Sequence, residues 1–134
     1  MTARAIFTLL VFLFILLAVL IIESFADVVI ETIIYESAGE QYQGQVLVAS
    51  VIKQRMLERN LRGGDVVLEP GQFSCWLNKN HREYTKKEYQ TALKAWTESE
   101  PMGWNHYCRY DCFPYWVKYA KEKLKVGNHI FYKL

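Results

Sequence analysis

Glu36 is the residue whose setting in the sequence best suits proton transfer. It ends an apolar stretch, follows Tyr35 and precedes a Ser-Ala-Gly break at residues 37–39. A carboxyl group that such neighbours partly remove from water keeps its proton to higher pH, so it can act as a general acid near neutrality. Glu40 is the nearest second carboxylate, and most glycoside hydrolases need two. The alternative is that Glu36 is simply a solvated residue at a helix end.

Cysteines and histidines offer two other chemistries. His106, Cys108, Cys112 and His129 are residue types that form tetrahedral zinc sites, although an exported protein would tend to oxidise the cysteines. Cys75 could instead be a nucleophile activated by His106 or His129. In an exported chain two of the three cysteines could form a disulfide, and their spacing does not determine which two. Nothing in the neighbouring sequence supports such a nucleophile, and we predict no metal site.

The composition favours one folded domain over a nucleic-acid-binding chain. The sequence has 134 residues, enough for one domain, and 15% are aromatic, including four Trp and nine Tyr. Such aromatics pack a core or line a groove that stacks on flat or sugar-like ligands. The net charge is only +2, but residues 101–134 carry six Lys/Arg against two Asp/Glu. We interpret these lysines as a solvated face, which could attract an anionic polymer, and expect no nucleic-acid partner.

Residues 1–26 are predicted to be an export signal or a membrane anchor. Within them residues 5–22 are uncharged and, apart from Thr8, apolar, and they follow a basic start. That length is short for a membrane-spanning helix and slightly long for the apolar region of a signal peptide. Ser24 and Ala26 are small residues at positions −3 and −1 of a potential cleavage site. The segment is therefore either a cleaved signal peptide or an anchor in the membrane, and residues 27–134 are expected on the outer side.

Two helices are predicted at the start of the domain. Asp27 is a suitable N-cap for an apolar-periodic helix over residues 27–36. Residues 43–60 form the strongest helical pattern, and the Gly63-Gly64 pair should terminate it.

The rest of the domain combines a third helix with short strands. Thr85 and Glu88 have capping-box spacing, and the apolar residues after them recur at helical intervals. Residues 105–107 and 129–132 are predicted as strands, with a helix at residues 115–124 between them. The expected fold is α+β and mainly helical: a single domain with a small β element, preceded by an N-terminal apolar helix.

Several separate motifs together resemble the SleB/CwlJ-type cell wall hydrolases. A Tyr/Glu pair at residues 35–36 is followed by Gly39-Glu40, Gly44-Gln45 and the pattern Val-Ala-x-Val-Ile-x-x-Arg at residues 48–55. Later segments match in the same order: Gln72-Phe73-Ser74, His106-Tyr107, Pro114-x-Trp116 and Gly127-x-His129-x-Phe131-Tyr132. Motifs that agree in order over nearly all of residues 27–134 are far more specific than any one alone.

This resemblance implies a lysozyme-like fold and cleavage of peptidoglycan glycan strands by a lytic transglycosylase. The family's essential glutamate corresponds to Glu36, which would protonate the oxygen between N-acetylmuramic acid and N-acetylglucosamine. It would then take the proton of the muramic acid C6 hydroxyl, which closes a 1,6-anhydro ring without a second carboxylate. The resemblance implies a monomer that uses no cofactor. Eight residues would line the groove or orient sugars: Tyr35, Glu40, Gln72, Ser74, His106, Tyr107, His129 and Tyr132.

Two other functions remain open from the sequence. An N-acetylmuramoyl-L-alanine amidase would cut the peptide stem, and a wall-binding or membrane-anchored accessory protein would cut nothing. A minimal catalytic domain behind an apolar segment also resembles phage lysis enzymes that the host exports. The fragments released from the wall distinguish these functions.

Overall fold

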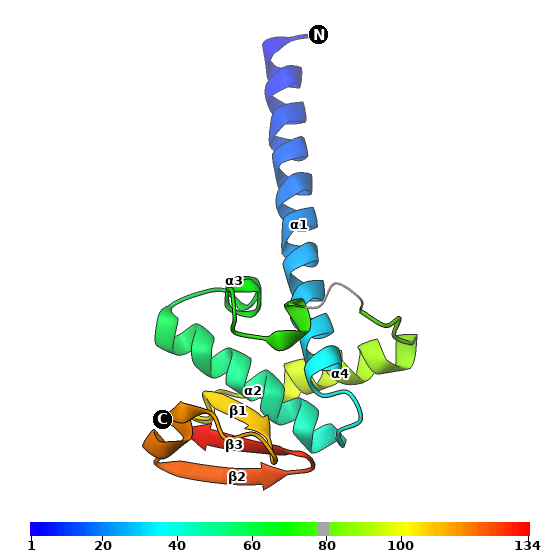
Figure 1. The fold of residues 1–134 in the computed structure, drawn as a ribbon. Coiled ribbons are helices and arrows are strands. Elements are labelled where there is room, and N and C mark those ends of the chain that lie inside the picture. The colour runs from blue at the N-terminus through cyan, green and yellow to red at the C-terminus, as the bar shows by residue number, and fades with distance from the viewer. Residues whose placement is uncertain (78–80) are drawn as a thin grey trace.

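The computed structural model describes residues 1–77 and 81–134, with the backbone alone at residues 22–26. The described residues form four α-helices, two 3₁₀ helices and one three-stranded antiparallel sheet. The helices gather around one end of the long α1, and the sheet lies at the end of the domain opposite the projecting part of α1 (Figure 1). The fold is therefore α+β and mainly helical, which confirms the predicted fold class.

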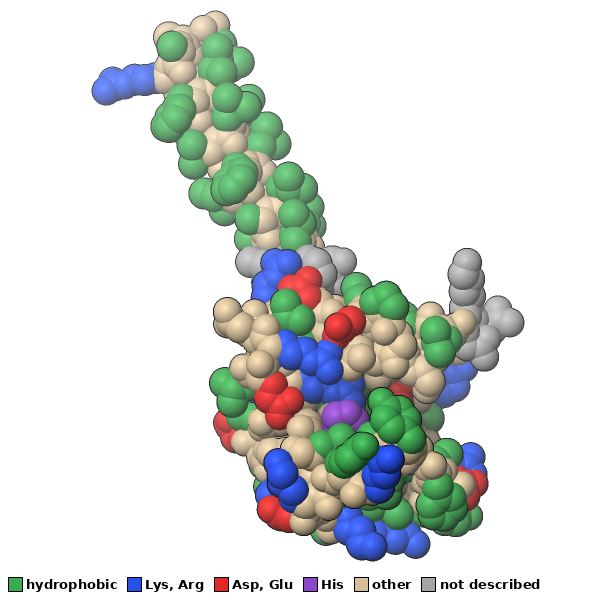
Figure 2. Space-filling view, turned by 60° about the vertical axis from the view of Figure 1, so that its left-hand side comes forward, with side chains coloured by type: hydrophobic (Ala, Val, Ile, Leu, Met, Phe, Trp, Pro, Cys, Tyr) green, Lys and Arg blue, Asp and Glu red, His purple; other side chains and the backbone are tan. Residues whose placement is uncertain are grey.

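The first helix, α1 (Ala3–Glu36), has two very different parts. Its N-terminal part projects from the domain, and its apolar side chains are uncovered (Figures 1 and 2). Its C-terminal part is buried, and it contributes four residues to the centre of the core: Val29, Ile30, Ile33 and Ile34. The C-terminal end of the helix is thus fixed by packing.

The prediction that Asp27 caps a separate helix is wrong, because α1 runs through this position. No Gly or Pro lies between the two apolar stretches, so nothing interrupts the backbone hydrogen bonds. The Asp27 carboxylate instead accepts a hydrogen bond from the Tyr89 hydroxyl at 2.6 Å. The side chains of Ser24 and Ala26, the predicted cleavage positions, lie outside the described part of the chain.

The second helix, α2 (Tyr42–Arg59), ends at Asn60, which takes the left-handed conformation with φ of 52°. The predicted stop at Gly63-Gly64 is wrong, since these glycines begin α3 (Gly63–Leu68). A Cβ atom on Gly63 would lie 2.9 Å from Cγ2 of Val29. The glycine is therefore used for the close approach of α3 to α1.

The fourth helix, α4 (Lys86–Glu98), begins with the predicted capping box. The Thr85 hydroxyl accepts from the Glu88 N–H (3.1 Å), and the Glu88 carboxylate accepts from the Thr85 N–H (2.8 Å). Ala92 and Ala95 are fully buried, and their small side chains let α4 pack closely on its neighbours α1 and α2.

The sheet consists of β1 (His106–Arg109), β2 (Glu122–Val126) and β3 (His129–Lys133), with β3 in the middle. Both pairings are antiparallel, and β1 pairs with β3 so that Tyr107 lies opposite Phe131. Phe131 is fully buried and belongs to the same core as α1 and α2. This contact joins the sheet to the helices.

The predicted helix at residues 115–124 is wrong. The chain forms the 3₁₀ helix η2 (Tyr115–Tyr119) and then enters β2. In β2 two lysines alternate with Leu124 and Val126, which is the period of a strand. Gly127 (φ 57°) and Asn128 then close a two-residue hairpin to β3, and a hairpin of this kind is a stronger signal than short helical spacing.

Candidate active site

The Glu36 carboxylate lies at the end of α1, where donors from two distant segments reach it. The Cys75 N–H donates to Oε1 at 2.9 Å, and the Ser74 hydroxyl lies 3.4 Å from the same oxygen. The Tyr107 hydroxyl donates to Oε2 at 2.6 Å. Ser74 and Cys75 belong to the 3₁₀ helix η1 (Ser74–Trp76), and Tyr107 belongs to β1. Both carboxylate oxygens are thus held in place, and the side chain remains half-buried.

The groups around Glu36 are held in their protonated forms. Burial, and then the charge of Glu36, raise the pKa of Tyr107 well above its usual value, so this hydroxyl stays a donor. The same two causes raise the pKa of the Cys75 thiol. A nucleophilic cysteine needs the opposite shift, toward the thiolate, so the environment of Cys75 argues against that alternative.

Arg55 connects the two segments that carry these donors. Its guanidinium is buried, and Nε donates to the backbone oxygen of Asn105 at 2.8 Å, directly before β1. Nη1 lies 3.4 Å from the backbone oxygen of Gln72, and the group stacks 5.0 Å from the Phe73 ring, both directly before η1. Sequence reasoning did not give Arg55 a role. The available signal was its position on the apolar stripe of α2, where a buried charge needs partners.

Two hollows meet at Glu36. The first has a volume of about 450 Å³ and the second about 350 Å³, and Glu36 lines both. The first is lined by Arg55, Gly71, Gln72, Ser74, His106, Tyr107, Tyr115 and Trp116. The second is lined by Ala38, Glu40, Arg109, Tyr110, Asn128 and His129. A carboxylate between two hollows is positioned to act on the middle of an extended ligand that fills both.

The sequence around this groove matches a known family. The family model of the cell wall hydrolases matches residues 39–132. The chain belongs to the cell wall hydrolase family. The match begins three residues after Glu36, so the role of Glu36 depends on the geometry just described. Among curated proteins no relative matches this chain.

Solved structures resemble this cell wall hydrolase as well. One is the catalytic domain of the germination-specific lytic transglycosylase SleB from Bacillus anthracis, with a TM-score of 0.63 and 27% identity over 79% of this chain and 91% of that one. Another is the catalytic domain of the Bacillus cereus SleB protein, with a TM-score of 0.62 and 27% identity over 80% of this chain and 91% of that one. The predicted resemblance to SleB-type hydrolases is confirmed.

Glu40 lines the groove of this hydrolase but is occupied by structural contacts. Its side chain is only 4% exposed, and both carboxylate oxygens lie 3.2 Å from the Asn128 N–H in the β2–β3 turn. Nδ1 of His129 lies 3.5 Å away and has no hydrogen-bond partner in the described part of the chain. A Cβ atom on Gly127 would clash with the Glu40 carboxylate, so this turn requires glycine. Glu40 therefore fastens the hairpin to the loop after α1.

Tyr35 and Tyr132 lie outside the two hollows of the hydrolase. The Tyr35 hydroxyl donates to the backbone oxygen of Arg82 at 3.2 Å, and its ring stacks on His81 at 4.4 Å. Tyr132 is buried and packs edge-on against Trp116 at 5.3 Å, which in turn contacts His106 at 4.8 Å. Tyr132 thus supports the wall of the first hollow from behind.

Gln72, Ser74, His106 and Tyr107, four of the predicted groove residues, line the first hollow. Burial and the nearby Arg55 lower the pKa of His106, which favours a neutral imidazole facing the groove. Sequence reasoning did not assign Gly71, Tyr115 or Trp116 to the groove, although all three line this hollow. The motif Pro114-x-Trp116 was the available signal for the last two.

The residues considered for zinc do not come together. Within residues 1–77 and 81–134 no group of three His, Cys, Asp or Glu side chains is arranged to hold a metal ion. Cys75, Cys108 and Cys112 are all unpaired, and the Cys108 thiol lies 3.5 Å from the backbone oxygen of Cys112.

Proposed function

We propose that this cell wall hydrolase is a lytic transglycosylase that cleaves the glycan strand of peptidoglycan, with Glu36 as the single acid and base. One observation carries the proposal: the Glu36 carboxylate, held by the Cys75 N–H and the Tyr107 hydroxyl, lies where the two hollows meet. A glycan strand in both hollows would present its scissile bond to this group. The similarity to SleB from Bacillus anthracis, a germination-specific lytic transglycosylase, supports the same reaction.

The proposed reaction needs one proton carrier. Protonated Glu36 donates its proton to the glycosidic oxygen, the bond from that oxygen to C1 of N-acetylmuramic acid breaks, and N-acetylglucosamine leaves as an alcohol. The Glu36 carboxylate then removes the proton of the C6 hydroxyl as this oxygen bonds to C1. The product is a 1,6-anhydro sugar, and Glu36 is protonated again.

The contacts of Glu36 and Glu40 support a reaction in which Glu36 alone transfers protons. The Tyr107 hydroxyl and the Cys75 N–H stabilise the carboxylate that exists between the two proton transfers. Glu40 is committed to the Asn128 N–H and is poorly exposed, so it is badly placed to activate a water molecule. Because the attacking C6 hydroxyl belongs to the substrate, the reaction needs no second carboxylate to activate water.

Replacement of Glu36 tests the proposal. Glu36→Gln is nearly isosteric but carries no transferable proton, so we expect release of 1,6-anhydro fragments from purified peptidoglycan to fall at least about 10³-fold. Mass spectrometry identifies the fragments, and circular dichroism checks the fold. The matched control is Glu31→Gln, five residues earlier on α1, where the carboxylate accepts a hydrogen bond from the Tyr84 hydroxyl at 2.8 Å and lines neither hollow.

The same mass spectra test the alternatives. Full activity of Glu36→Gln would refute the assignment of Glu36. Free stem peptides released by the wild-type chain would identify an amidase, and wall binding without fragments would identify an accessory protein.

We further propose that residues 5–22 insert into the membrane and that the domain acts on its wall side, a suitable arrangement for a lysis enzyme. Among the described residues one helical segment, Ala3–Ile21, is long and apolar enough to span a bilayer, with a mean hydropathy of 2.9. It is not covered by the domain, and an uncovered apolar surface of this size favours lipid or a secretion machinery as its partner.

A further inference from the structure

A separate pocket of about 240 Å³ lies on the other side of the loop that follows α1. It opens between the end of α1, the start of α2 and the start of α4. Its lining residues are Ile34, Ser37, Ala38, Gly39, Glu40, Gln45, Arg82, Lys87, Glu88 and Thr91. Neither Glu36 nor the first hollow takes part in it, so the proposed glycan cleavage leaves this pocket without a role.

One short loop separates this pocket from the groove. Ala38 and Glu40 line both the pocket and the second hollow. The loop cannot easily move aside, because the Glu40 carboxylate is tied to the Asn128 N–H. The loop also passes close to α2, since a Cβ atom added to Gly44 would lie 3.0 Å from the Cβ of Glu40. A branch on a sugar in the second hollow would need to cross only the loop residues 38–40 to enter the pocket.

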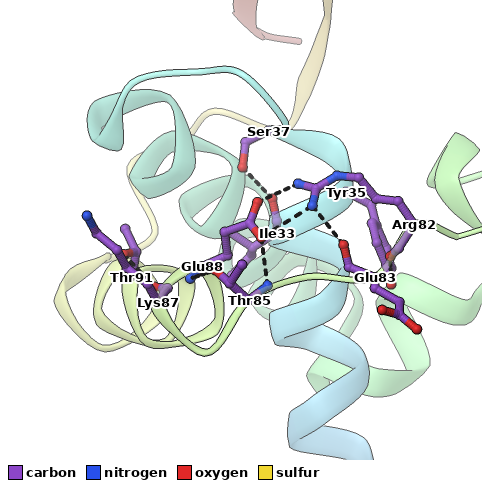
Figure 3. A network of polar contacts seen from close by, with 9 residues as sticks. All are labelled: Ile33, Tyr35, Ser37, Arg82, Glu83, Thr85, Lys87, Glu88 and Thr91. Carbon is purple, nitrogen blue, oxygen red and sulfur yellow. Dashed lines mark hydrogen bonds and ion pairs between the residues drawn. The ribbon is translucent and has the colours of Figure 1, made fainter.

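The polar groups of the pocket divide into a satisfied set and an unsatisfied set. Arg82 and Glu88 form an ion pair, with Nη2 of Arg82 2.6 Å from Oε1 of Glu88, and Glu88 also completes the helix cap (Figure 3). Lys87 and Thr91 lie apart from this pair on α4 (Figure 3). The side chains of Lys87 and Gln45 make no hydrogen bond or ion pair with other described residues. The uncommitted groups are thus an ammonium and a primary amide.

An ammonium beside a free amide suits a ligand with carboxylates and peptide bonds. Lys87 offers three charged donors, which bind a carboxylate best. The Gln45 amide can both donate and accept, which matches a peptide group. Within peptidoglycan the peptide stem, an acidic peptide joined to the lactyl group of N-acetylmuramic acid, has this chemistry, and it branches from the sugar chain itself.

We propose that this pocket, the Lys87 pocket, binds the peptide stem of the substrate while the sugars occupy the groove. The inference rests on the proposed function, because only a glycan in the groove brings a stem to the loop. The Lys87 pocket makes the enzyme prefer glycan that still carries its stems.

Kinetics on two substrates test the proposal with the full chain. The substrates are purified glycan strands with their stems and the same strands after an amidase has removed them. Lys87→Ala and Gln45→Glu should each raise KM about tenfold on stem-bearing glycan and leave KM on bare glycan unchanged. Gln45→Glu keeps the side-chain size but repels a carboxylate. Lys86→Ala, next on the chain and absent from the pocket lining, is the matched control.

The two-substrate design separates this inference from the proposed function. Equal losses on both substrates, or no loss on stem-bearing glycan, would overturn the Lys87 pocket while Glu36 chemistry stands. A direct measurement is independent of catalysis: an isolated stem tetrapeptide should perturb the NMR signals of α4 in the wild-type chain and not in Lys87→Ala. Identical perturbation in both would also overturn it. Absence of 1,6-anhydro products from the wild-type chain would instead refute the proposed reaction.

Discussion

The two parts of α1 are both apolar and belong to one helix, yet they meet opposite environments. Residues 3–21 are uncovered, whereas Val29, Ile30, Ile33 and Ile34 are buried in the core. The difference is a polar stripe. Asp27, Glu31 and Tyr35 recur every four residues in the second part, and the first part has no such stripe.

This stripe docks α4 and the segment before it. The Tyr89 hydroxyl donates to Asp27 at 2.6 Å, and the Tyr84 hydroxyl donates to Glu31 at 2.8 Å. The Tyr35 hydroxyl donates to the backbone oxygen of Arg82, in the segment that precedes α4. A helix with one polar stripe is positioned by a protein core, and a helix apolar on all sides needs a uniform apolar surrounding.

The continuity of α1 has a geometric consequence. At about 1.5 Å per residue, the 19-residue segment Ala3–Ile21 spans about 28 Å, close to the hydrocarbon thickness of a bilayer, and Glu36 lies about 22 Å beyond residue 21. In an anchored chain one helix would therefore fix the height of Glu36 and the candidate active site above the lipid.

The largest expected contrast comes from the same substitution in both parts of α1. Ile33 is fully buried and Ile15 is 55% exposed. We expect Ile33→Ala to lower the free energy of unfolding by about 2–5 kcal/mol because it leaves a cavity, and Ile15→Ala to change it by less than about 0.5 kcal/mol. Denaturant unfolding of the full chain in detergent micelles measures both. Equal losses would mean that the two parts do not differ as described.

A charge in the uncovered part should release the chain from membranes. Leu13→Arg places a cation near the middle of the apolar segment, which costs about 2.5–3.5 kcal/mol of insertion free energy. We expect less protein in carbonate-washed membranes than for the wild type. The control, Leu57→Arg, alters an exposed leucine of α2 and should leave the membrane fraction unchanged. A wild-type chain found only in the soluble fraction, beginning at Asp27, would show instead that the segment is cleaved.

The smallest expected effect concerns the polar stripe. Tyr89→Phe removes the bond to Asp27 and should lower the free energy of unfolding by about 1 kcal/mol near pH 8, with Tyr119→Phe as an exposed control.

The pH dependence of this effect has a definite sign. The bond to Asp27, and then burial, raise the pKa of Tyr89 from 10.0 to about 12. The folded chain then holds this proton more tightly than the unfolded chain, so the stabilisation is complete below about pH 10 and disappears as the pH rises toward 12. Wild type and Tyr89→Phe should converge over that range in unfolding measurements. A difference that stays constant would show that the hydrogen bond contributes nothing.

Predictions that rested on neighbouring residues agree best with the structure. The capping box of Thr85 and Glu88, and the helix that follows it, need only a few adjacent residues. Two predictions were wrong: a helix that starts at Asp27, and a helix at residues 115–124. In each case the local sequence allowed two structures, and the rest of the fold selected between them. Buried β3 offers β2 a ladder of hydrogen bonds that an isolated segment lacks.

The sequence by itself determined the helical character of the chain, its apolar N-terminal segment and its resemblance to SleB-type hydrolases, and it singled out Glu36 as the candidate acid. Only the tertiary structure decided what surrounds that carboxylate. Its donors, the Cys75 N–H and the Tyr107 hydroxyl, lie 39 and 71 positions further along the chain. Arg55, buried in α2, fastens the segments that carry both. Local patterns encode helices and turns, but the distance between two remote side chains exists only after the core has packed.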